Sequence, residues 1–395
     1  MPNDPIDVKT LISRYSLEQL NEAAEQYWRG HAGSEKLQAK PFTLDEIQHL
    51  LVQVAHLIGG LELYEGMTVL DFGAGSCWAS RILNQLGMRV ISCDVSQAAL
   101  DLGASLRGKY PPVGEQPDHV FLRFDGRRFD LPNESVDRIF CLDALHHVSS
   151  QTDVVKEMAR ILKQGGIAGF SEPGPNHSRH PGSQFEMRNY TVIENDICLN
   201  DIFAAAKESG FTRMKVAVAP IHPTMVPFVE LASFFSDVAQ FAATVRDRVT
   251  NYPIFFLYKG ESQILDSRTP AGLVAETRME NAGAVDSRTP LRFRFLARNS
   301  SSKTWLPSGS RPGSVNIGAF LHSSEPREGR MQPEERRFSL SLKEVPPGET
   351  VSSEIDFGTL KPGRYTLESD LVSEHVCWFQ ANCDSRITMD LLIEP

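Results

Sequence analysis

The stretch "VLDFGAGSCWASRIL", residues 69–83, determines how the first half of the chain folds. An apolar run ends in Asp71, two glycines follow with one residue between them, and apolar residues then recur at helical spacing. This order of strand, glycine-rich turn and helix is typical of the nucleotide-binding turn of an open α/β sheet. Trp78 occupies the position at which a dinucleotide site carries its third glycine. The turn therefore predicts a nucleotide-like cofactor but departs from the dinucleotide pattern.

Short apolar runs alternate with helical segments from residue 67 to residue 260. Runs such as "MTVLDF", "RVISCD" and "VDRIFCL" lack clear in-and-out alternation, and helices are predicted between them. This pattern indicates a parallel sheet covered by helices on both faces. The runs "TRMKVAVA" and "NYPIFFLYKG" could form an antiparallel edge pair. We therefore predict an α/β fold with a seven-stranded, doubly wound sheet. The predicted helices around it are 77–86, 97–108, 152–163, 200–209 and 226–248.

The sheet region is flanked by two segments with different patterns. The N-terminal segment shows apolar positions at helical spacing, and both Ser16 with Gln19 and Thr43 with Glu46 have capping-box spacing. After residue 260, Pro, Gly and Ser punctuate short alternating runs such as "LRFRFLARN". We therefore predict three domains. They are an N-terminal helical cap (1–66), the α/β domain (67–260) and an antiparallel β-sandwich (261–395).

The composition argues against several classes of partner. The 395 residues carry a formal net charge of −10, whereas nucleic-acid-binding proteins usually carry a basic field. No apolar stretch reaches the ~18 residues of a membrane-spanning helix, and "MPNDPIDVKT" lacks the regions of a signal peptide. None of the six cysteines forms a CxxC pair. We predict a reduced, cytoplasmic protein with no nucleic-acid partner, no integral membrane segment and no metal site.

The acid before the glycines narrows the choice of cofactor. Asp71 would place a negative charge near the pyrophosphate of a nicotinamide dinucleotide, whereas it suits a cationic ligand without phosphate. The motif "DFGAG", the acid that ends "VISCD" and the segment "FCLDALHHV" resemble successive motifs of class I SAM-dependent methyltransferases, over roughly residues 40–260. The resemblance implies S-adenosyl-L-methionine (SAM) as the cofactor. A nicotinamide dinucleotide is the alternative.

The resemblance implies specific roles for the glycine turn. Gly73 and Gly75 match the family's glycines, which lack a Cβ and so let the backbone approach the cofactor; Ala74 lies between them. Asp71 matches the acid that orients this turn and the methionyl amine. We therefore expect this turn to hold the methionine part of SAM.

Two further strand ends resemble the family's nucleoside-binding segments. Asp94 matches the carboxylate that accepts both ribose hydroxyls, and Val95 follows it. Asp125 and Gly126, in "RFDGRRFD", match the position that reads adenine. These residues follow strands at their carboxyl ends, where open α/β sheets bind ligands.

The segment after the fourth strand combines cofactor-binding and catalytic candidates. Leu142 and Asp143 match the family segment that lines the methionine and the transferable methyl group. His146 and His147 follow directly, so they are candidates for a base that removes a proton from the acceptor. The alternative is that one of these histidines caps or packs the next helix.

The polar insertion "SEPGPNHSRHPGSQFEMRNYTVIENDI", residues 171–197, is the other candidate source of catalytic groups. Long polar insertions in compact domains are usually functional or mobile. Glu172, which we expect to face the cleft at the end of a strand, and His177 are the main candidates. Further polar side chains that could contact a substrate are Arg179, His180, Glu186, Arg188 and Tyr190. The alternative is a solvated surface loop.

The C-terminal segment resembles the immunoglobulin-like modules that follow catalytic domains in some bacterial polysaccharide-biosynthesis enzymes. The likeness rests on "NSSSKTWLPSGS" and "KPGRYTLESDLV". Trp305, Trp378 and Phe379 could stack on sugar rings or fill the sandwich core.

We therefore expect a SAM-dependent methyltransferase that acts on a polar acceptor, a sugar or glycan intermediate of polysaccharide biosynthesis. The C-terminal domain would then dock to a glycan-assembly complex. The alternatives are a methyltransferase for a lipid, quinone or other small metabolite, and a non-catalytic assembly component with a SAM fold.

Overall fold

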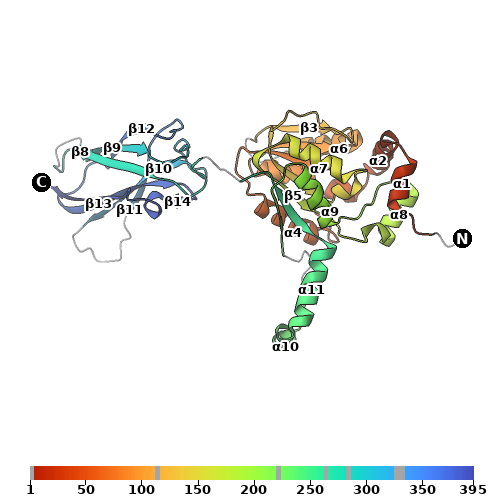
Figure 1. Ribbon diagram of the computed structural model, residues 1–395. Coiled ribbons are helices and arrows are strands. Elements are labelled where there is room, and N and C mark those ends of the chain that lie inside the picture. Colours follow the sequence, from red (N-terminus) through yellow and green to blue (C-terminus); the bar gives the residue numbers. More distant parts are fainter. Residues whose placement is uncertain (1–3, 112–115, 219–223, 262–265, 282–285, 324–333) are drawn as a thin grey trace. The chain divides into compact units, whose positions relative to one another are not determined.

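The computed structural model describes residues 4–111, 116–218, 224–261, 266–281, 286–323 and 334–395. The chain divides into two compact units, Met1–Ser262 and Gln263–Pro395 (Figure 1). Each unit has a hydrophobic core of its own, which is the property that defines a domain.

A seven-stranded sheet forms the centre of the first unit, with the strand order β3-β2-β1-β4-β5-β7-β6. The predicted fold class is confirmed. The antiparallel pair β6–β7 is also present, but β7 lies between β5 and β6 and runs antiparallel to both. The strands are β1 (Thr68–Phe72), β2 (Arg89–Asp94), β3 (His119–Arg123), β4 (Val136–Leu142), β5 (Leu162–Ser171), β6 (Arg213–Val216) and β7 (Ile254–Tyr258).

Helices cover both faces of this sheet, because successive side chains of each strand point to opposite sides. Leu70 and Ile139 pack with α7 and α9 in one core cluster. Their neighbours Val69 and Phe140 pack with α4 and α5 in another. The helices are α1 (Val8–Arg14), α2 (Leu17–His31), α3 (Glu35–Ala39), α4 (Ile47–Gly60), α5 (Trp78–Gln85), α6 (Gln97–Lys109), α7 (Gln151–Ile161), α8 (Pro181–Tyr190) and α9 (Leu199–Glu208).

The two predicted capping boxes differ in outcome. Ser16 and Gln19 form the reciprocal box at the start of α2. The box predicted for Thr43 and Glu46 is wrong, because the Thr43 hydroxyl donates to the Glu46 carboxylate at 3.3 Å within a turn before the helix. Glu46 itself is the residue before α4, which begins at Ile47.

The single helix predicted over 226–248 is interrupted. A short 3₁₀ turn (Phe228–Glu230) leads into α10 (Leu231–Ser236), and α11 (Val238–Asn251) starts anew. Asp237 accounts for the restart, since its carboxylate accepts the Gln240 N–H at 2.9 Å. Among the described residues no single helix has the length and apolar composition of a membrane span. Phe228–Ser236 and Val238–Asn251 are bent by 96° relative to one another, and they reach that length and composition only when they are counted as one segment.

The second unit is built from two antiparallel sheets around one core, consistent with the predicted sandwich. One sheet has the order β11-β10-β13-β14 with β15 also paired to β13, and the other has the order β12-β9-β8. Trp305 and Phe379 are fully buried in the core between them, so neither can stack on a sugar, whereas Trp378 is half-buried. The strands are β8 (Ala275–Asn281), β9 (Arg292–Asn299), β10 (Val315–Ser323), β11 (Glu334–Ser339), β12 (Thr350–Asp356), β13 (Gly363–Ser373), β14 (Cys377–Trp378) and β15 (Ile387–Ile393).

Candidate active site

A cavity of about 600 Å³ opens at the carboxyl ends of β1, β2 and β4. The strand order reverses between β1 and β4, which is where open α/β sheets bind ligands. Helix α2 lines the opposite wall with an apolar face that includes Leu20, Tyr27 and Trp28. The sequence-predicted residues that line this cavity are Gly73, Ala74, Gly75, Asp94, Val95, Gly126, Leu142, Asp143, His146, His147, His177, His180 and Glu186.

The glycine turn requires both of its glycines. Gly73 and Gly75 have φ angles of 69° and 52°, in the left-handed region that favours glycine. A Cβ on Gly73 would lie 2.2 Å from the Ala144 Cβ, and one on Gly75 would lie 3.0 Å from the Trp28 ring. The turn is therefore held close to the β4 loop on one side and to α2 on the other.

Asp94 reaches back to this turn from the end of β2. One carboxylate oxygen accepts the Gly75 N–H at 2.9 Å and the other accepts the Ser96 N–H at 2.9 Å. Burial raises the pKa of Asp94, while these two backbone bonds oppose that effect. The carboxylate is thus fixed at the cavity edge, where the ribose of an adenosine cofactor is expected.

Asp71 does not line the cavity. It lies beneath the glycine turn and accepts a short hydrogen bond from the Ser80 hydroxyl of α5. Burial raises its pKa to about 7. This position is consistent with the predicted role of Asp71 in orienting the turn. Because Asp71 is not among the residues that line the cavity, its side chain has no direct access to the methionyl amine.

Asp143 is the carboxylate that faces the cavity near the expected methyl group. It holds a φ of 50°, which is uncommon outside glycine, and its N–H donates to the Ser171 carbonyl at 2.9 Å. Desolvation by the surrounding protein raises its pKa to about 6, and the nearby Glu172 charge adds to the effect. Leu142 precedes it and lines the same wall.

The predicted adenine-reading position has its side chain turned away from the cavity. The Asp125 carboxylate accepts the N–H groups of Arg127 and Arg128, both at 2.7 Å, and so caps its own turn. Its carbonyl accepts the Asn21 amide of α2 at 2.8 Å. Gly126 alone of the predicted pair lines the cavity.

Helix α2 is anchored over the cavity by a buried acid. Glu25 accepts the Ser96 hydroxyl at 2.8 Å and the Ala98 N–H at 3.2 Å, at the N-terminus of α6. A negative charge is favourable at that end of a helix. Arg29, one turn further along α2, pairs with the same carboxylate at 2.8 Å.

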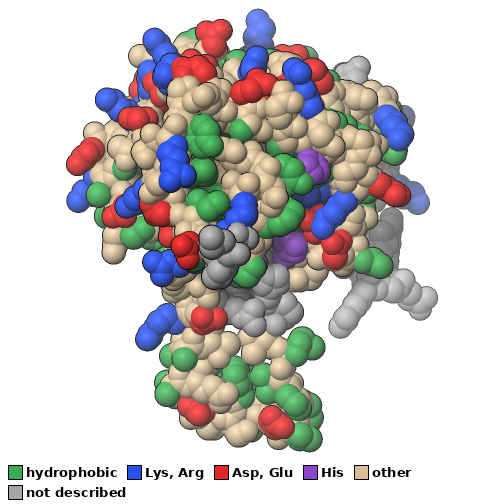
Figure 2. Space-filling view, turned by 90° about the vertical axis from the view of Figure 1, so that its right-hand side faces the viewer, with side chains coloured by type: hydrophobic (Ala, Val, Ile, Leu, Met, Phe, Trp, Pro, Cys, Tyr) green, Lys and Arg blue, Asp and Glu red, His purple; other side chains and the backbone are tan. Residues whose placement is uncertain are grey.

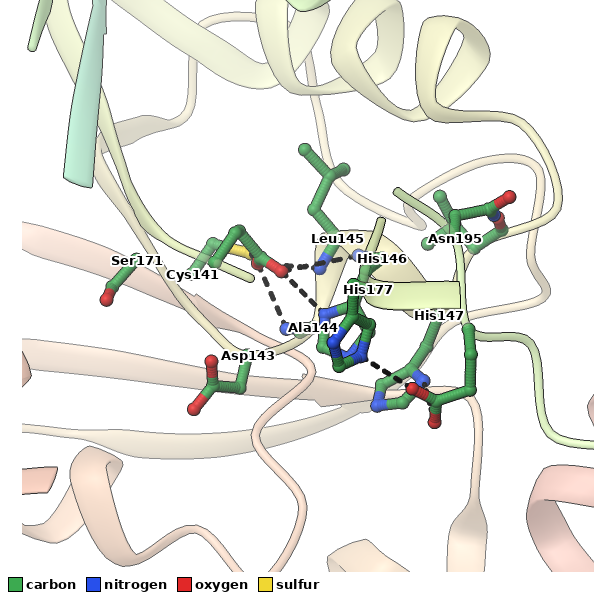
Figure 3. Close-up of polar contacts among 12 residues, drawn as sticks. Cys141, Asp143, Ala144, Leu145, His146, His147, Ser171, His177 and Asn195 are labelled. Atoms are coloured by element: carbon green, nitrogen blue, oxygen red, sulfur yellow. Dashed lines mark hydrogen bonds and ion pairs between the residues drawn. The ribbon is translucent and has the colours of Figure 1, made fainter. Parts of the chain in front are cut away.

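Glu172 is a positioning residue and does not face the cleft as predicted. Its side chain is fully buried at the end of β5, where it accepts the N–H groups of Ala144 and Leu145 at 3.0 and 2.8 Å. It also binds the His146 ring, through Nδ1 at 2.7 Å (Figure 3). The buried carboxylate therefore sets the shape of the turn after β4 and the orientation of one histidine.

Three histidines and one acid gather at the other end of the cavity. The ring of His146 lies 3.9 Å from that of His147 and 4.9 Å from that of His177 (Figure 3). Glu194 accepts from His177 Nε2 at 2.7 Å and has an oxygen 3.6 Å from His147 Nδ1. Hydrogen bonding to His177 and the other nearby histidines lower the Glu194 pKa to about 2 despite its burial. We call this group the histidine cluster.

Sequence reasoning did not identify Glu194, although it lies within the polar insertion 171–197. That insertion is ordered rather than a solvated loop: it forms a 3₁₀ turn (His177–Arg179) and α8. Met187 of α8 packs with Leu11 of α1 and Leu20 of α2 in a small core, and Leu20 also lines the cavity.

The residues around the cavity fit SAM better than a dinucleotide. Asp94 and Asp143 place two carboxylates on its wall, which suits a ligand with an ammonium, a sulfonium and ribose hydroxyls. Lys40 is the single Lys or Arg among the residues that line this cavity, so a pyrophosphate would find little opposite charge. The glycine turn leaves room for close backbone approach.

Comparison with known proteins agrees with this cofactor. Residues 70–170 match the family described as "Methyltransferase domain". The match supports the predicted methyltransferase fold and is consistent with SAM as the cofactor; the predicted domain bounds 67–260 stay a prediction.

Several curated methyltransferases are similar over part of the chain. Phosphoethanolamine N-methyltransferase 3 of Arabidopsis thaliana is 28% identical over 46% of this chain and 38% of its own length. Demethylmenaquinone methyltransferase of Paenarthrobacter aurescens is 27% identical over 39% of this chain and 58% of its own length. Sterol 24-C-methyltransferase ERG6A of Gibberella zeae is 24% identical over 48% of this chain and 50% of its own length. The chain therefore spans less than two thirds of each of these relatives.

Two solved methyltransferase structures are similar over part of the chain. A putative methyltransferase of Haloferax volcanii, solved with the activator Trm112, superimposes with a TM-score of 0.43 at 19% identity, over 62% of this chain and 98% of that one. Geranyl diphosphate C-methyltransferase of Streptomyces coelicolor A3(2) gives a TM-score of 0.43 at 15% identity, over 61% of this chain and 98% of that one.

Proposed function

We propose that this chain transfers the methyl group of SAM to a small acceptor bound beside the histidine cluster. One observation carries the proposal: a single cavity joins the carboxylate-lined cofactor end, at Asp94 and Asp143, to the cluster of His146, His147 and His177. The cofactor supplies an already activated methyl group, so the protein mainly aligns the acceptor and receives its proton.

Two of the histidines are held by carboxylates, as a general base requires. Glu172 accepts from His146 Nδ1, which leaves Nε2 for the acceptor. Burial lowers the pKa of His146 well below its usual value, which keeps the ring neutral but also makes it a weaker base. Glu194 orients His177 in the same manner. The arrangement suits an acceptor that loses a proton, such as a hydroxyl or an amine.

A sugar or glycan intermediate is the acceptor class we expect from the likeness of the C-terminal module. The polar histidine cluster supports it, and so does the half-buried Trp378, which lines a small depression with Gln380 and Arg386 on the second unit. In this proposal the second unit docks the enzyme to a glycan-assembly complex. We place the reaction in the cytoplasm, since all six cysteines are free thiols.

A lipid-soluble acceptor is the second candidate, because one surface segment is strongly apolar. The segment 224–245 contains no Lys or Arg, and Phe228, Val229 and Val238 are 87%, 88% and 71% exposed. Figure 2 shows α10 and the tip of α11 projecting from the first unit, with apolar side chains on their surface. Some of the similar curated enzymes are named for menaquinone and sterol substrates.

A transfer assay with labelled SAM separates these candidates. Soluble sugar acceptors, ethanolamine-type amines and quinols in neutral-lipid vesicles would be offered to the full chain. The proposal expects label in one class of acceptor and its loss in His146→Ala/His147→Ala, with SAM binding retained by calorimetry. An unchanged rate in that double variant would exclude both histidines as bases. SAM binding without transfer to any acceptor would favour a non-catalytic assembly component.

A further inference from the structure

We propose that His146, His147 and Glu194 bind one divalent transition-metal cation at the acceptor end of the cavity. Each residue offers one ligand atom, and the three atoms lie within 4.8 Å of one another. The sequence, which has no CxxC pair, predicts no metal site; the structure brings Glu194 beside two histidines from a different part of the chain. The inference rests on the proposed function in that the ion would lie where we place the acceptor; with the ion bound, His146 and His147 would hold it as ligands, and the ion, in place of these two bases, would promote loss of the acceptor's proton.

The two imidazole rings are already oriented as metal ligands are. His146 Nδ1 lies 2.7 Å from the Glu172 carboxylate, and His147 Nδ1 lies 2.6 Å from the Ile193 carbonyl. Since a carbonyl oxygen and a carboxylate accept, each Nδ1 carries the proton and each Nε2 keeps a lone pair. Metal-bound histidines almost always donate their other ring N–H to a carboxylate or a backbone carbonyl in this way.

The third ligand is a carboxylate whose other contacts hold it in place. The Glu194 side chain is 7% exposed, and one of its oxygens accepts from His177 Nε2 at 2.7 Å. His177 would thus support the carboxylate from outside the ligand set. Only His147 of the three ligands is well exposed, with 41% of its side chain accessible, so the site is open on one side.

The donor set indicates the class of ion. Two imidazole nitrogens and one carboxylate oxygen suit Zn²⁺, Fe²⁺, Co²⁺ or Mn²⁺, whereas Mg²⁺ and Ca²⁺ prefer oxygen ligands. Three protein ligands leave coordination positions vacant, as in catalytic rather than structural sites. The vacant positions would bind an oxygen or nitrogen of the acceptor and orient it within the cavity.

The test measures metal binding by the full chain, independently of methyl transfer. Chelator-treated protein would be titrated with Co²⁺, with stoichiometry from equilibrium dialysis and the d–d absorption of bound Co²⁺ as a second readout. We expect one ion per chain, and at least a tenfold loss of affinity in His147→Gln and in Glu194→Gln. His147→Gln is the safer variant for folding because this side chain is partly exposed. Glu186→Gln is the matched control, since Glu186 lines the same cavity outside the ligand set.

Each result separates the metal site from the proposed function. The metal site would be overturned if the native chain bound no Co²⁺. It would also be overturned if His147→Gln and Glu194→Gln bound Co²⁺ as tightly as the native chain, or if Glu186→Gln abolished binding. Methyl transfer by metal-free protein at full rate, without ion binding, would leave the proposed function standing and remove the metal. The chain could also bind one Co²⁺ through His147 and Glu194 but neither bind SAM nor transfer a methyl group. That result would support the metal site and exclude the proposed methyltransferase function.

Discussion

Asp94 uses both oxygens of its carboxylate to bind backbone N–H groups of two different segments, and still lies at the cavity edge. Asp94→Asn removes the charge and one acceptor with little change of shape. Because hydrogen bonds to charged groups contribute about 1.5–3 kcal/mol, we expect SAM affinity to fall about 10- to 100-fold. Calorimetric titration measures this loss. Asp101→Asn, an exposed change on α6, is the control; equal SAM affinity in the two variants would remove the ribose assignment.

A chain of hydrogen bonds runs from Arg107 of α6 to the acid below the glycine turn. Arg107 donates to His119 Nδ1 at 3.1 Å, and His119 Nε2 contacts the Ser92 hydroxyl at 2.7 Å. Ser92 then donates to Ser80, which donates to Asp71. Burial, helped by the Arg107 charge, lowers the pKa of His119 to about 4. The neutral imidazole is therefore part of the support for the cofactor turn.

This pKa predicts a pH dependence of stability. An unfolded histidine titrates near ~6.5, so between pH 6.5 and 4 the unfolded chain binds more protons at His119. Acidification through that window should therefore lower the free energy of unfolding. Asp71, with its raised pKa, acts in the opposite direction, so the comparison is with His119→Gln, whose amide can still accept and donate. The advantage of the native chain over this variant, measured by urea unfolding, should shrink from pH 7 to pH 5. A difference that does not vary with pH would contradict the assignment.

At the scale of secondary-structure elements, the sequence predicts what depends on local chemistry. The order of strands and helices follows from periodicity, and the turn at Gly73 and Gly75 follows from the backbone angles that only glycine adopts readily. The role of a side chain whose partners come from a distant part of the sequence could not be predicted from local patterns. Glu172 is polar and near a strand end, but its contacts with Ala144 and His146 come from a different strand.

The helix predicted over 226–248 is interrupted for a local physical reason. Side chains that compete for backbone partners, such as Asp237 before α11, restart a helix without changing its apolar periodicity. The antiparallel pairing of β6 with β7 is confirmed; the order of the strands, with β7 between β5 and β6, was not predicted, because it is set by sheet pairing and the local pattern of "NYPIFFLYKG" contains no information on it.

Helix α2 depends on one buried acid for its position over the cavity. Glu25→Ala leaves the Ser96 hydroxyl and the Ala98 N–H without their acceptor and removes a favourable charge from the start of α6. We expect a loss of about 1–3 kcal/mol in the free energy of unfolding, measured by denaturant titration. Glu22→Ala, an exposed position on the same helix, should cost much less. Equal losses would show that α2 is held by its apolar face alone.

At the scale of the whole molecule, the two units differ in what they can bind. The cavity, the glycine turn and the histidine cluster all lie within Met1–Ser262. The second unit has its own core, which includes Phe293, Trp305 and Phe379. SAM should therefore stabilise one unit and leave the other unchanged.

Scanning calorimetry of the full chain tests this expectation. At a SAM concentration of 100 Kd, ligand binding adds about 2.7 kcal/mol to the stability of the unit that binds it. For a unit of this size, that raises its Tm by roughly 5–10 °C. The transition of Gln263–Pro395, identified by expressing this segment alone, should keep its Tm, because its core is complete without the first unit. Asp94→Asn, with SAM affinity lowered about 10- to 100-fold, should remove about half or more of the SAM-induced shift at the same concentration. A shift of both transitions by SAM would mean that the second unit shares in binding the cofactor, contrary to the location of every cavity residue within the first unit.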